Sequence, residues 1–257
     1  MGLKVAYMPD EAIEKDAEAL IAEYAHSRQL TIKLPIPVDD IVEKHLKLGI
    51  EFDDMHRLFG VPRSGFGFDP DIVGAMFFDE RRIVIDESLD PDANPAKEGR
   101  YRYTLAHEAG HWRLHRGLVG KDPAQGSLLD TPGPPSVICR KSDAKERVEF
   151  QADLYASCLL MPRSMVHFEW KERLGRSSPL LLRDLRPNGS VMMRAERRVS
   201  ELGQREVDAV DDALLEEVAE PFAQRFRVSR AAMRIRLERM GLMLRREPDQ
   251  KTIKGLF

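Results

Sequence analysis

Two histidines and a glutamate lie close together in the segment Tyr-Thr-Leu-Ala-His-Glu-Ala-Gly-His, which covers residues 103–111. On a helix, His107 and His111 would lie on one face, about one turn apart. Two imidazoles at this spacing could bind one zinc ion, and Glu108 could take a proton from a water bound to that ion. The segment therefore predicts a metal-dependent protease.

The third ligand separates the classes of protease that share this motif. One class places a third histidine six residues after the second, but that position is Gly117 here. Another class takes a glutamate from a later helix, and Glu149 lies in a predicted helix further along the chain. Two histidines and one carboxylate leave a fourth zinc position for water. We therefore predict that His107, His111 and Glu149 bind the metal and that Glu108 is the catalytic general base.

Further polar residues of the two predicted helices could support the metal or contact the substrate. Asp153 could accept the spare ring N–H of a ligand histidine and fix its tautomer, or it could only cap and solvate its own helix. His115 extends the stripe of histidines, either as such a support, as a substrate contact, or as a solvated residue. A side-chain donor often stabilises the oxyanion of a transition state. Candidates for that role are Tyr101, Tyr103, Tyr155 and His115.

The composition excludes several other functional classes. The chain has 257 residues, of which 42% are hydrophobic, enough for one large domain or a domain with a smaller one. A formal net charge of -3 gives no general polycation for nucleic acid or a membrane, and no apolar run is long enough to span a bilayer. Two cysteines and a start without a signal-peptide pattern favour a cytoplasmic protein with no membrane partner.

Several helices are expected to position these residues. Apolar residues recur at helical spacing, and polar caps, glycines and prolines bound the segments. Asp39 is a plausible N-cap of one helix, and Ser229 is a plausible N-cap of another. Helices are predicted over residues 10–28, 38–48, 100–116 and 142–161, with two more between residues 208 and 244.

A small β-meander is expected before the motif helix, between residues 66 and 86. Apolar runs over residues 72–78 and 83–85 flank the turn-forming segment 79–82. In many zinc proteases an exposed strand beside the cleft pairs with the extended substrate, and either run could supply that edge strand. The alternative is an internal sheet packed on the motif helix. We favour the edge strand.

The residues around both motifs resemble the ImmA/IrrE family of bacterial metallopeptidases. The resemblance rests on residues 105–115 and on Glu-Phe-Gln-Ala-Asp-Leu-Tyr-Ala-Ser-Cys-Leu-Leu-Met-Pro, residues 149–162. The family's second motif usually has asparagine where this chain has Asp153 and phenylalanine where it has Tyr155. The resemblance covers most of the chain except the middle of residues 174–208. It implies a cytoplasmic, gluzincin-like zinc protease that typically cleaves a helix-turn-helix repressor of the Xre type.

The C-terminal part of the chain is basic, with ten arginines and lysines from Arg225 to Lys254. Two predicted helices with a short turn at Val228–Ser229 resemble a helix-turn-helix. These helices could bind DNA, could pack on the protease core with a solvated arginine face, or could dock the repressor. Of these three hypotheses, DNA binding is not the one that we favour.

We therefore predict an α+β fold with three parts. A zincin-like metallopeptidase core covers residues 1–165, an irregular connector covers residues 166–207, and a helix-turn-helix-like region packed on the core covers residues 208–257. The predicted activity is that of a zinc-dependent endopeptidase with one Zn²⁺, and Mn²⁺, iron or cobalt would suit the same ligands. The alternative is a catalytically weak regulatory or DNA- or protein-binding module with a structural metal site.

Overall fold

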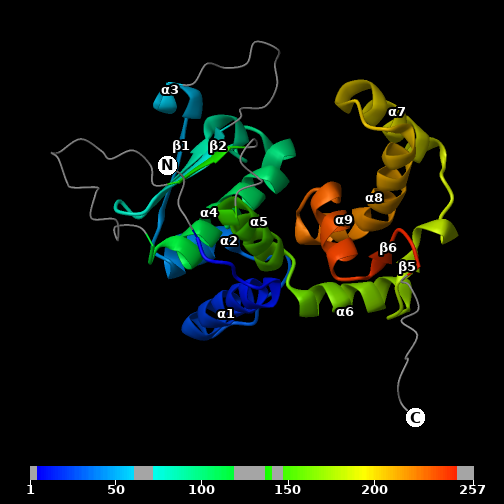
Figure 1. Ribbon diagram of the computed structural model, residues 1–257. Coiled ribbons are helices and arrows are strands. Elements are labelled where there is room, and N and C mark those ends of the chain that lie inside the picture. The colour runs from blue at the N-terminus through cyan, green and yellow to red at the C-terminus, as the bar shows by residue number, and fades with distance from the viewer. Residues whose placement is uncertain (1–4, 61–71, 119–136, 141–146, 248–257) are drawn as a thin grey trace. The chain divides into compact units, whose positions relative to one another are not determined.

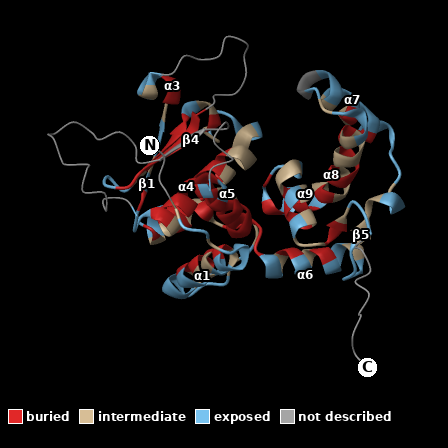
Figure 2. Ribbon diagram, viewed as in Figure 1, coloured by how far each residue is buried: buried red, intermediate tan, exposed pale blue. Residues whose placement is uncertain are grey.

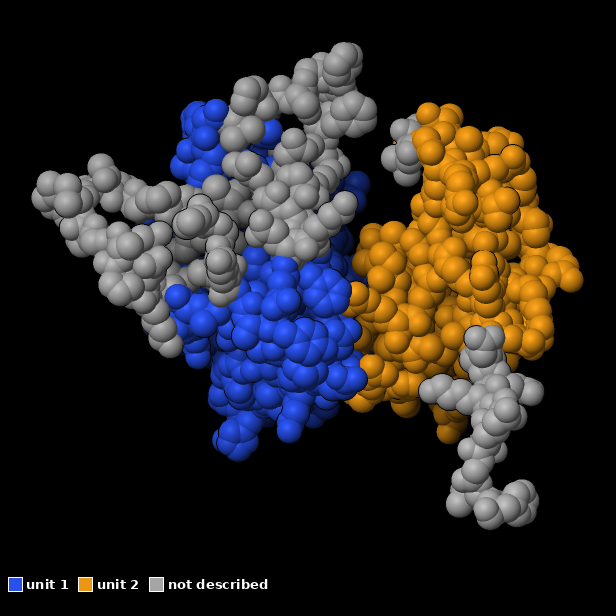
Figure 3. All heavy atoms as spheres, viewed as in Figure 1, with its two compact units in different colours: residues 1–162, 225–228 blue, residues 163–224, 229–257 orange. Residues whose placement is uncertain are grey.

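The computed structural model describes residues 5–60, 72–118, 137–140 and 147–247, and it divides the chain into two compact units. Unit 1 comprises residues 1–162 and 225–228, and unit 2 comprises residues 163–224 and 229–257 (Figure 3). Figure 1 labels the elements along the chain. The helices of unit 1 are α1 (Asp10–Arg28), α2 (Val38–Asp40), η1 (Ile41–His45), α3 (Met55–Phe59), η2 (Glu87–Leu89), η3 (Pro95–Lys97), α4 (Glu98–His115) and α5 (Arg147–Leu160).

The first helix confirms the sequence prediction residue for residue. α1 runs from Asp10 to Arg28 and buries the apolar residues that recur at helical spacing. The second predicted helix is shorter than expected. It consists of α2 followed by the π-helical turn η1, which ends at His45. Asp39 is not its cap, because its side chain instead accepts a hydrogen bond from the Tyr101 hydroxyl at 2.5 Å. A contact with α4 has taken the place of the local cap.

The sheet of unit 1 is mixed, so the expectation of a simple meander is wrong. Its strands are β1 (Gly49–Asp53), β2 (Ile72–Phe77), β3 (Arg82–Asp86) and β4 (Val137–Arg140), in the order β1-β3-β2-β4. β2 and β3 form the predicted antiparallel hairpin, but β1 pairs with β3 in parallel and β4 pairs with β2 in antiparallel fashion. Neither predicted run is an edge strand, because long-range pairing covers both. β1 and β4 are the edges.

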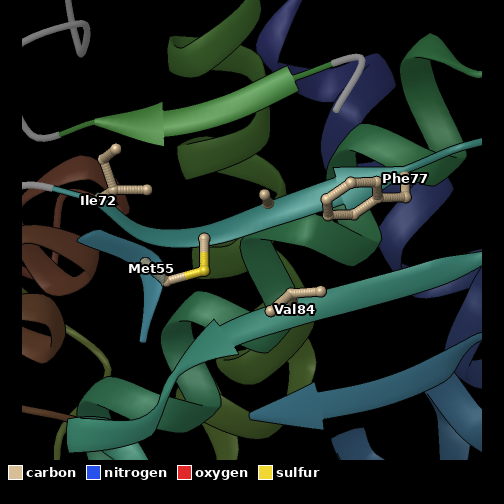
Figure 4. Packing of buried hydrophobic residues seen from close by; sticks show 5 residues of the cluster. Met55, Ile72, Phe77 and Val84 are labelled. Carbon is tan, nitrogen blue, oxygen red and sulfur yellow. The ribbon is translucent and has the colours of Figure 1, made fainter. Parts of the chain in front are cut away.

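One face of this sheet packs against α3 through a small apolar cluster (Figure 4). Strict alternation would place Ile72 on the face opposite Ala75 and Phe77. The pairing with β4 shifts between Ile72 and Gly74, as in a β-bulge, and this shift lets Ile72 share a face with the other two. The cluster consists of Met55, Ile72, Ala75, Phe77 and Val84.

α4 and α5 lie at the centre of unit 1 and pack along each other. α4 also contacts β2 and β3, and α5 also contacts α1. Figure 2 shows both helices as largely buried. The central position explains why α4 buries polar residues as well as apolar ones, including both histidines of the motif and Glu108. Burial of this kind is costly unless the polar groups have a purpose or a partner.

Unit 2 is mainly helical, and the segment expected to be an irregular connector contains two of its helices. α6 follows Pro162, and α7 begins after Asn188, whose side chain accepts from the Val191 backbone N–H at 3.0 Å. α7 then packs Val191 and Ala195 against α8. The helix therefore combines an N-cap with an apolar face that is buried within the unit. The elements are α6 (Arg163–Leu174), β5 (Leu180–Leu181), η5 (Leu182–Asp184), α7 (Gly189–Leu202), α8 (Glu206–Phe226), α9 (Arg230–Arg239) and β6 (Met243–Leu244).

The two C-terminal helices form where the sequence predicts them. The chain turns between α8 and α9, and the Ser229 side chain caps α9 by accepting from the Ala232 backbone N–H at 3.1 Å. β5 and β6 pair in parallel as a second, two-stranded sheet. None of the helices in the described part of the chain combines the length and the apolar character needed to cross a membrane.

Candidate metal centre

Both histidines of the motif lie on one buried face of α4. The side chains of His107 and His111 have 3% and 0% of their surface exposed, and their Nε2 atoms are 2.9 Å apart. The spacing of four residues brings the rings together because successive turns of a helix stack side chains at i and i+4. Burial lowers the pKa of His111 to about 4, so its imidazole is neutral at pH 7 and available as a ligand.

α5 brings Glu149 against these two rings. One carboxylate oxygen is 3.1 Å from His107 Nε2, and the other is 3.5 Å from His111 Nε2. Burial alone would raise the pKa of Glu149, but the neighbouring imidazoles lower it to about 2. Glu149 is therefore a carboxylate at neutral pH.

The atoms that converge at this point fit a metal ion. One ligand atom from each of His107, His111 and Glu149 lies within 4.8 Å of the others. The atoms that meet are ring nitrogens and carboxylate oxygens, and the oxygens of an ionised carboxylate only accept hydrogen bonds. A single proton can bridge two such atoms, whereas a divalent cation can accept lone pairs from all of them. Nitrogen and oxygen ligands in this combination suit zinc and several other first-row metals.

Glu108 lies beside the ligand group, and neither of its carboxyl oxygens has a hydrogen-bond partner among the residues that the structure describes. The side chain is fully buried. Burial and the charge of Glu149 raise the pKa of Glu108 to about 8, although His107 opposes the change. An unpaired buried carboxyl destabilises a fold, so its retention points to a role in binding or chemistry.

Gly74 of β2 is a site residue that the sequence analysis missed. A Cβ atom at this position would lie 2.8 Å from Glu108 Oε1 and 2.8 Å from Thr104 Cγ2. The missing side chain therefore makes the space in which the Glu108 carboxylate lies. A glycine inside an otherwise apolar strand is a known sign that another group approaches closely, and this signal was present in the run from Ile72 to Phe78.

Asp153 lies one turn after Glu149 on α5 and contacts the outer nitrogen of His107. Its Oδ1 is 2.9 Å from His107 Nδ1. A proton on that nitrogen leaves the Nε2 lone pair directed at the ligand group. The Asp153 side chain is partly exposed at 42%, so this carboxylate stays hydrated while it holds the buried ring.

His115 contacts the outer nitrogen of His111, as Asp153 contacts that of His107, and it is buried rather than solvated. Its exposed fraction is 1%, and its Nδ1 is 3.1 Å from His111 Nδ1. Its Nε2 is 2.9 Å from the side-chain oxygen of Gln151 on α5. The structure thus places a polar partner behind each histidine of the motif.

The hydroxyl groups of Tyr103 and Tyr155 bind to different parts of unit 1. Tyr103 donates its hydroxyl proton to the Asp153 backbone carbonyl at 3.1 Å, next to the residue that holds His107. Tyr155 is fully buried and donates to Asp16 of α1 at 3.2 Å, so its hydroxyl bonds away from the ligands. Of the predicted site residues, the structure brings together His107, Glu108, His111, Glu149 and Asp153, with His115 in contact with His111.

The sequence of this chain matches the model of one protein family. Residues 63–178 match the family model described as the IrrE N-terminal-like domain, Peptidase_M78. The matched segment spans the hairpin of β2 and β3, all of α4 and all of α5, and therefore every residue of the ligand group. A search of the curated proteins finds no match to this chain.

Proposed function

We propose that this chain, whose residues 63–178 belong to the IrrE N-terminal-like domain family, is a zinc-dependent endopeptidase that makes limited, regulatory cuts in a protein substrate. The observation that carries the proposal is the unpaired, buried carboxyl of Glu108 beside three converging ligand groups. A structural metal site needs the ligands alone. A carboxyl held next to them without a partner is what peptide hydrolysis requires.

His107, His111 and Glu149 would hold the ion, which when bound supplies a Lewis acid that acidifies water and polarises a peptide carbonyl. Glu108 takes a proton from the attacking water as its oxygen bonds to the carbonyl carbon. The same carboxyl then delivers that proton to the leaving nitrogen as the C–N bond breaks. The raised pKa of Glu108 means that it needs positive charge nearby to ionise at neutral pH, and an ion held by the adjoining ligand group would supply that charge.

The arrangement of α4 and α5 beside a mixed sheet supports a zincin-like core of the gluzincin type. β4 lies at the edge of that sheet, next to β2, and β2 carries Gly74 against Glu108. An extended substrate segment that paired with the outer edge of β4 would add a strand to the sheet. We assign the pairing with substrate to β4, and not to β2 or β3, because both of those strands are internal. Tyr103 is our candidate for a further contact near the substrate, given its place beside Asp153.

The substrate that we propose is a helix-turn-helix repressor of the Xre type, on the strength of the resemblance of the two motifs, and we place the activity in the cytoplasm. Zinc-loaded protein should cut the repressor encoded beside its gene at one or a few bonds, mapped by mass spectrometry. Glu108→Gln should retain bound zinc and fold while cleavage falls by at least about 100-fold, because it removes the general base. Full cleavage by this variant would contradict the proposal, and an uncut repressor with the unchanged chain would remove that substrate.

The alternative of DNA binding through the C-terminal helices has less support from the ion pairs of unit 2. α8 and α9 have a helix-turn-helix-like order, but several arginines of this region pair with acidic groups of the same unit. Arg230 pairs with Glu220, and Arg234 pairs with Glu238 at 2.7 Å and with Asp212 at 3.3 Å. Cations committed in this way contribute less to phosphate contacts. Binding to unrelated duplexes with a steep salt dependence would reverse this preference.

A further inference from the structure

A continuous chain of polar contacts runs from the backbone before α1 to the ligand group. The amide nitrogen of Gln151 donates to the Ala6 backbone carbonyl at 2.8 Å, and the amide oxygen of Gln151 is 2.9 Å from His115 Nε2. His115 Nδ1 is in turn 3.1 Å from His111 Nδ1. His111, His115 and Gln151 have exposed fractions of 0%, 1% and 2%, so water does not compete for the contacts among these three side chains.

The Ala6 carbonyl sets the direction of every bond in this chain, because a carbonyl oxygen can only accept. The Gln151 NH₂ group therefore faces Ala6, and its oxygen faces His115. That oxygen also can only accept, so His115 carries its proton on Nε2. The other nitrogen of a neutral His115 ring, Nδ1, is then an acceptor and takes the proton that His111 holds on Nδ1. His111 is left with a bare Nε2.

We propose that His115, Gln151 and the Ala6 carbonyl act as a relay that holds His111 in the tautomer whose Nε2 lone pair faces the ligand group. His115 and Gln151 are positioning residues, since neither is within the group of ligand atoms. The inference rests on the proposed function only in taking that group as a metal site. It deepens that proposal by assigning roles to residues beyond the motif and to the segment that precedes α1.

The two ligand histidines are thus held in different ways. His107 has a carboxylate behind it, Asp153, which is partly exposed at 42%. His111 has a neutral, fully buried partner, His115, which is held by Gln151, and Gln151 in turn donates to a carbonyl 145 positions before it in the sequence. A second carboxylate in that buried place would add an uncompensated charge, which is costly, whereas imidazole and amide groups give the same direction without charge.

The first test reads the tautomers directly in the metal-free protein at pH 7.5, by long-range ¹⁵N–¹H NMR of histidine side chains. We expect His111 with its proton on Nδ1 and His115 with its proton on Nε2. His115→Leu removes the acceptor, so His111 should become a mixture of tautomers. His115→Asn returns an acceptor near the Nδ1 position and should restore the single tautomer. A native His111 protonated on Nε2, or a His111 signal unchanged in His115→Leu, would overturn the relay.

The second test measures Co²⁺ affinity by competition with a chromophoric chelator. Loss of such an outer partner typically weakens metal binding by about 10- to 100-fold, and His115→Leu should fall in that range with His115→Asn close to the native value. Gln151→Met keeps the bulk and removes the acceptor of His115, so it covers the case in which His115→Leu does not fold. Asp153→Asn is the matched control, since it should change the signals of His107 and leave His111 as it is.

The outcomes separate this inference from the proposed activity. If the protein cleaves no substrate but the tautomer and the Co²⁺ affinity respond to His115→Leu, the relay stands and the peptidase proposal fails. If cleavage is found but Co²⁺ affinity and the His111 tautomer are the same in the native chain, His115→Leu and Gln151→Met, the relay fails and the peptidase proposal stands.

Discussion

At the scale of single residues, the site depends on how closely a strand approaches the motif helix. Glu108 is buried without a partner, and the space beside it exists because position 74 has no side chain. A carboxyl in such a place has its pKa set by burial first, and this raises it to about 8. Position 74 therefore controls both where the Glu108 carboxyl lies and how it ionises.

We predict that Gly74→Ala lowers peptidase activity strongly and stability moderately. The new methyl group would lie 2.8 Å from Glu108 Oε1 and from Thr104 Cγ2, so the carboxylate or the strand has to move. Overpacking of this kind costs about 1–3 kcal/mol of unfolding free energy. Gly49→Ala on β1 is the control, because the nearest atom to its Cβ is the Arg81 carbonyl oxygen at 4.0 Å. Equal kcat/KM for both variants would show that the approach of Gly74 has no catalytic consequence.

The sequence could predict the residues that chemistry requires at fixed local spacing, and it could not predict their neighbours from other elements. His107, Glu108 and His111 lie within one helix, so their geometry follows from the helical period. Glu149 could be found because one known ligand pattern takes a carboxylate from a later helix. Gly74 and Gln151 lie at the site through pairings between distant segments, and no local pattern fixes those pairings.

At the scale of elements, the distance between α4 and α5 decides whether the ligands meet. α4 supplies two residues of the candidate ligand group and α5 supplies the third, and the helices are in contact at Gly110 and Tyr155. The Tyr155 ring lies over Gly110, with Cβ at 3.0 Å from where a Gly110 Cβ would be, and its hydroxyl bonds to Asp16 of α1. The structure thus assigns Tyr155 to the packing of α5 between α4 and α1.

Gly110→Ala should push α5 away from α4 and so weaken metal binding. The added methyl group would meet three atoms of Tyr155 at 3.0–3.2 Å, and this aromatic residue is fully buried and held by its hydroxyl to Asp16. We expect a loss of about 1–3 kcal/mol of stability together with a measurable drop in Zn²⁺ affinity by competition titration. Gly117→Ala, where no atom lies within 4 Å of the added Cβ, should leave both values near those of the native chain. Native Zn²⁺ affinity in Gly110→Ala would contradict this account of the interface.

The elements themselves were predictable to different degrees. α1 matches its prediction because five apolar residues repeat at helical spacing along an otherwise charged segment. The hairpin of β2 and β3 is local, and the sequence pattern predicts it. β1 and the strand order of the sheet could not be predicted, because the parallel pairing of Gly49–Asp53 with β3 joins distant segments and has no local sequence signal. α7 lies in the segment predicted to be irregular, although Asn188 at its N-cap, Gly203 after its last residue and apolar residues at helical spacing are all signals of a helix.

At the scale of the whole chain, a near-neutral net charge of -3 hides strong local pairing. Asp212 of α8 is the centre of one such network in unit 2. Its carboxylate accepts hydrogen bonds from Arg245 and from Gln204, the latter at 3.0 Å, and it lies 3.3 Å from Arg234 and 3.7 Å from Arg198. The side chain is 13% exposed, so screening by solvent is limited. These contacts hold α8 to its neighbours within the unit.

This network predicts a specific pH dependence of stability. Burial alone would raise the pKa of Asp212, but its hydrogen bonds from Arg245 and Gln204 and the charge of Arg234 lower it below its ordinary value of 3.8. A lowered carboxyl pKa stabilises the fold above pH 3.8, and this contribution is lost as the pH falls below that value. Asp212→Asn should therefore cost about 2 kcal/mol at pH 7 and progressively less in acid, measured by urea unfolding.

The adjacent residue Asp211 should respond with the opposite sign, which makes it the control for the pH series. Burial, together with the charges of Asp208 and Asp212, raises its pKa even though Arg245 opposes them. The ionised form of Asp211 thus destabilises the fold at neutral pH, and Asp211→Asn should leave the chain as stable or slightly more stable there. That difference should also vanish in acid, when the native carboxyl is protonated. If both variants lost the same stability at pH 7, the effect would come from the substitution of aspartate in α8 and not from the arginine network.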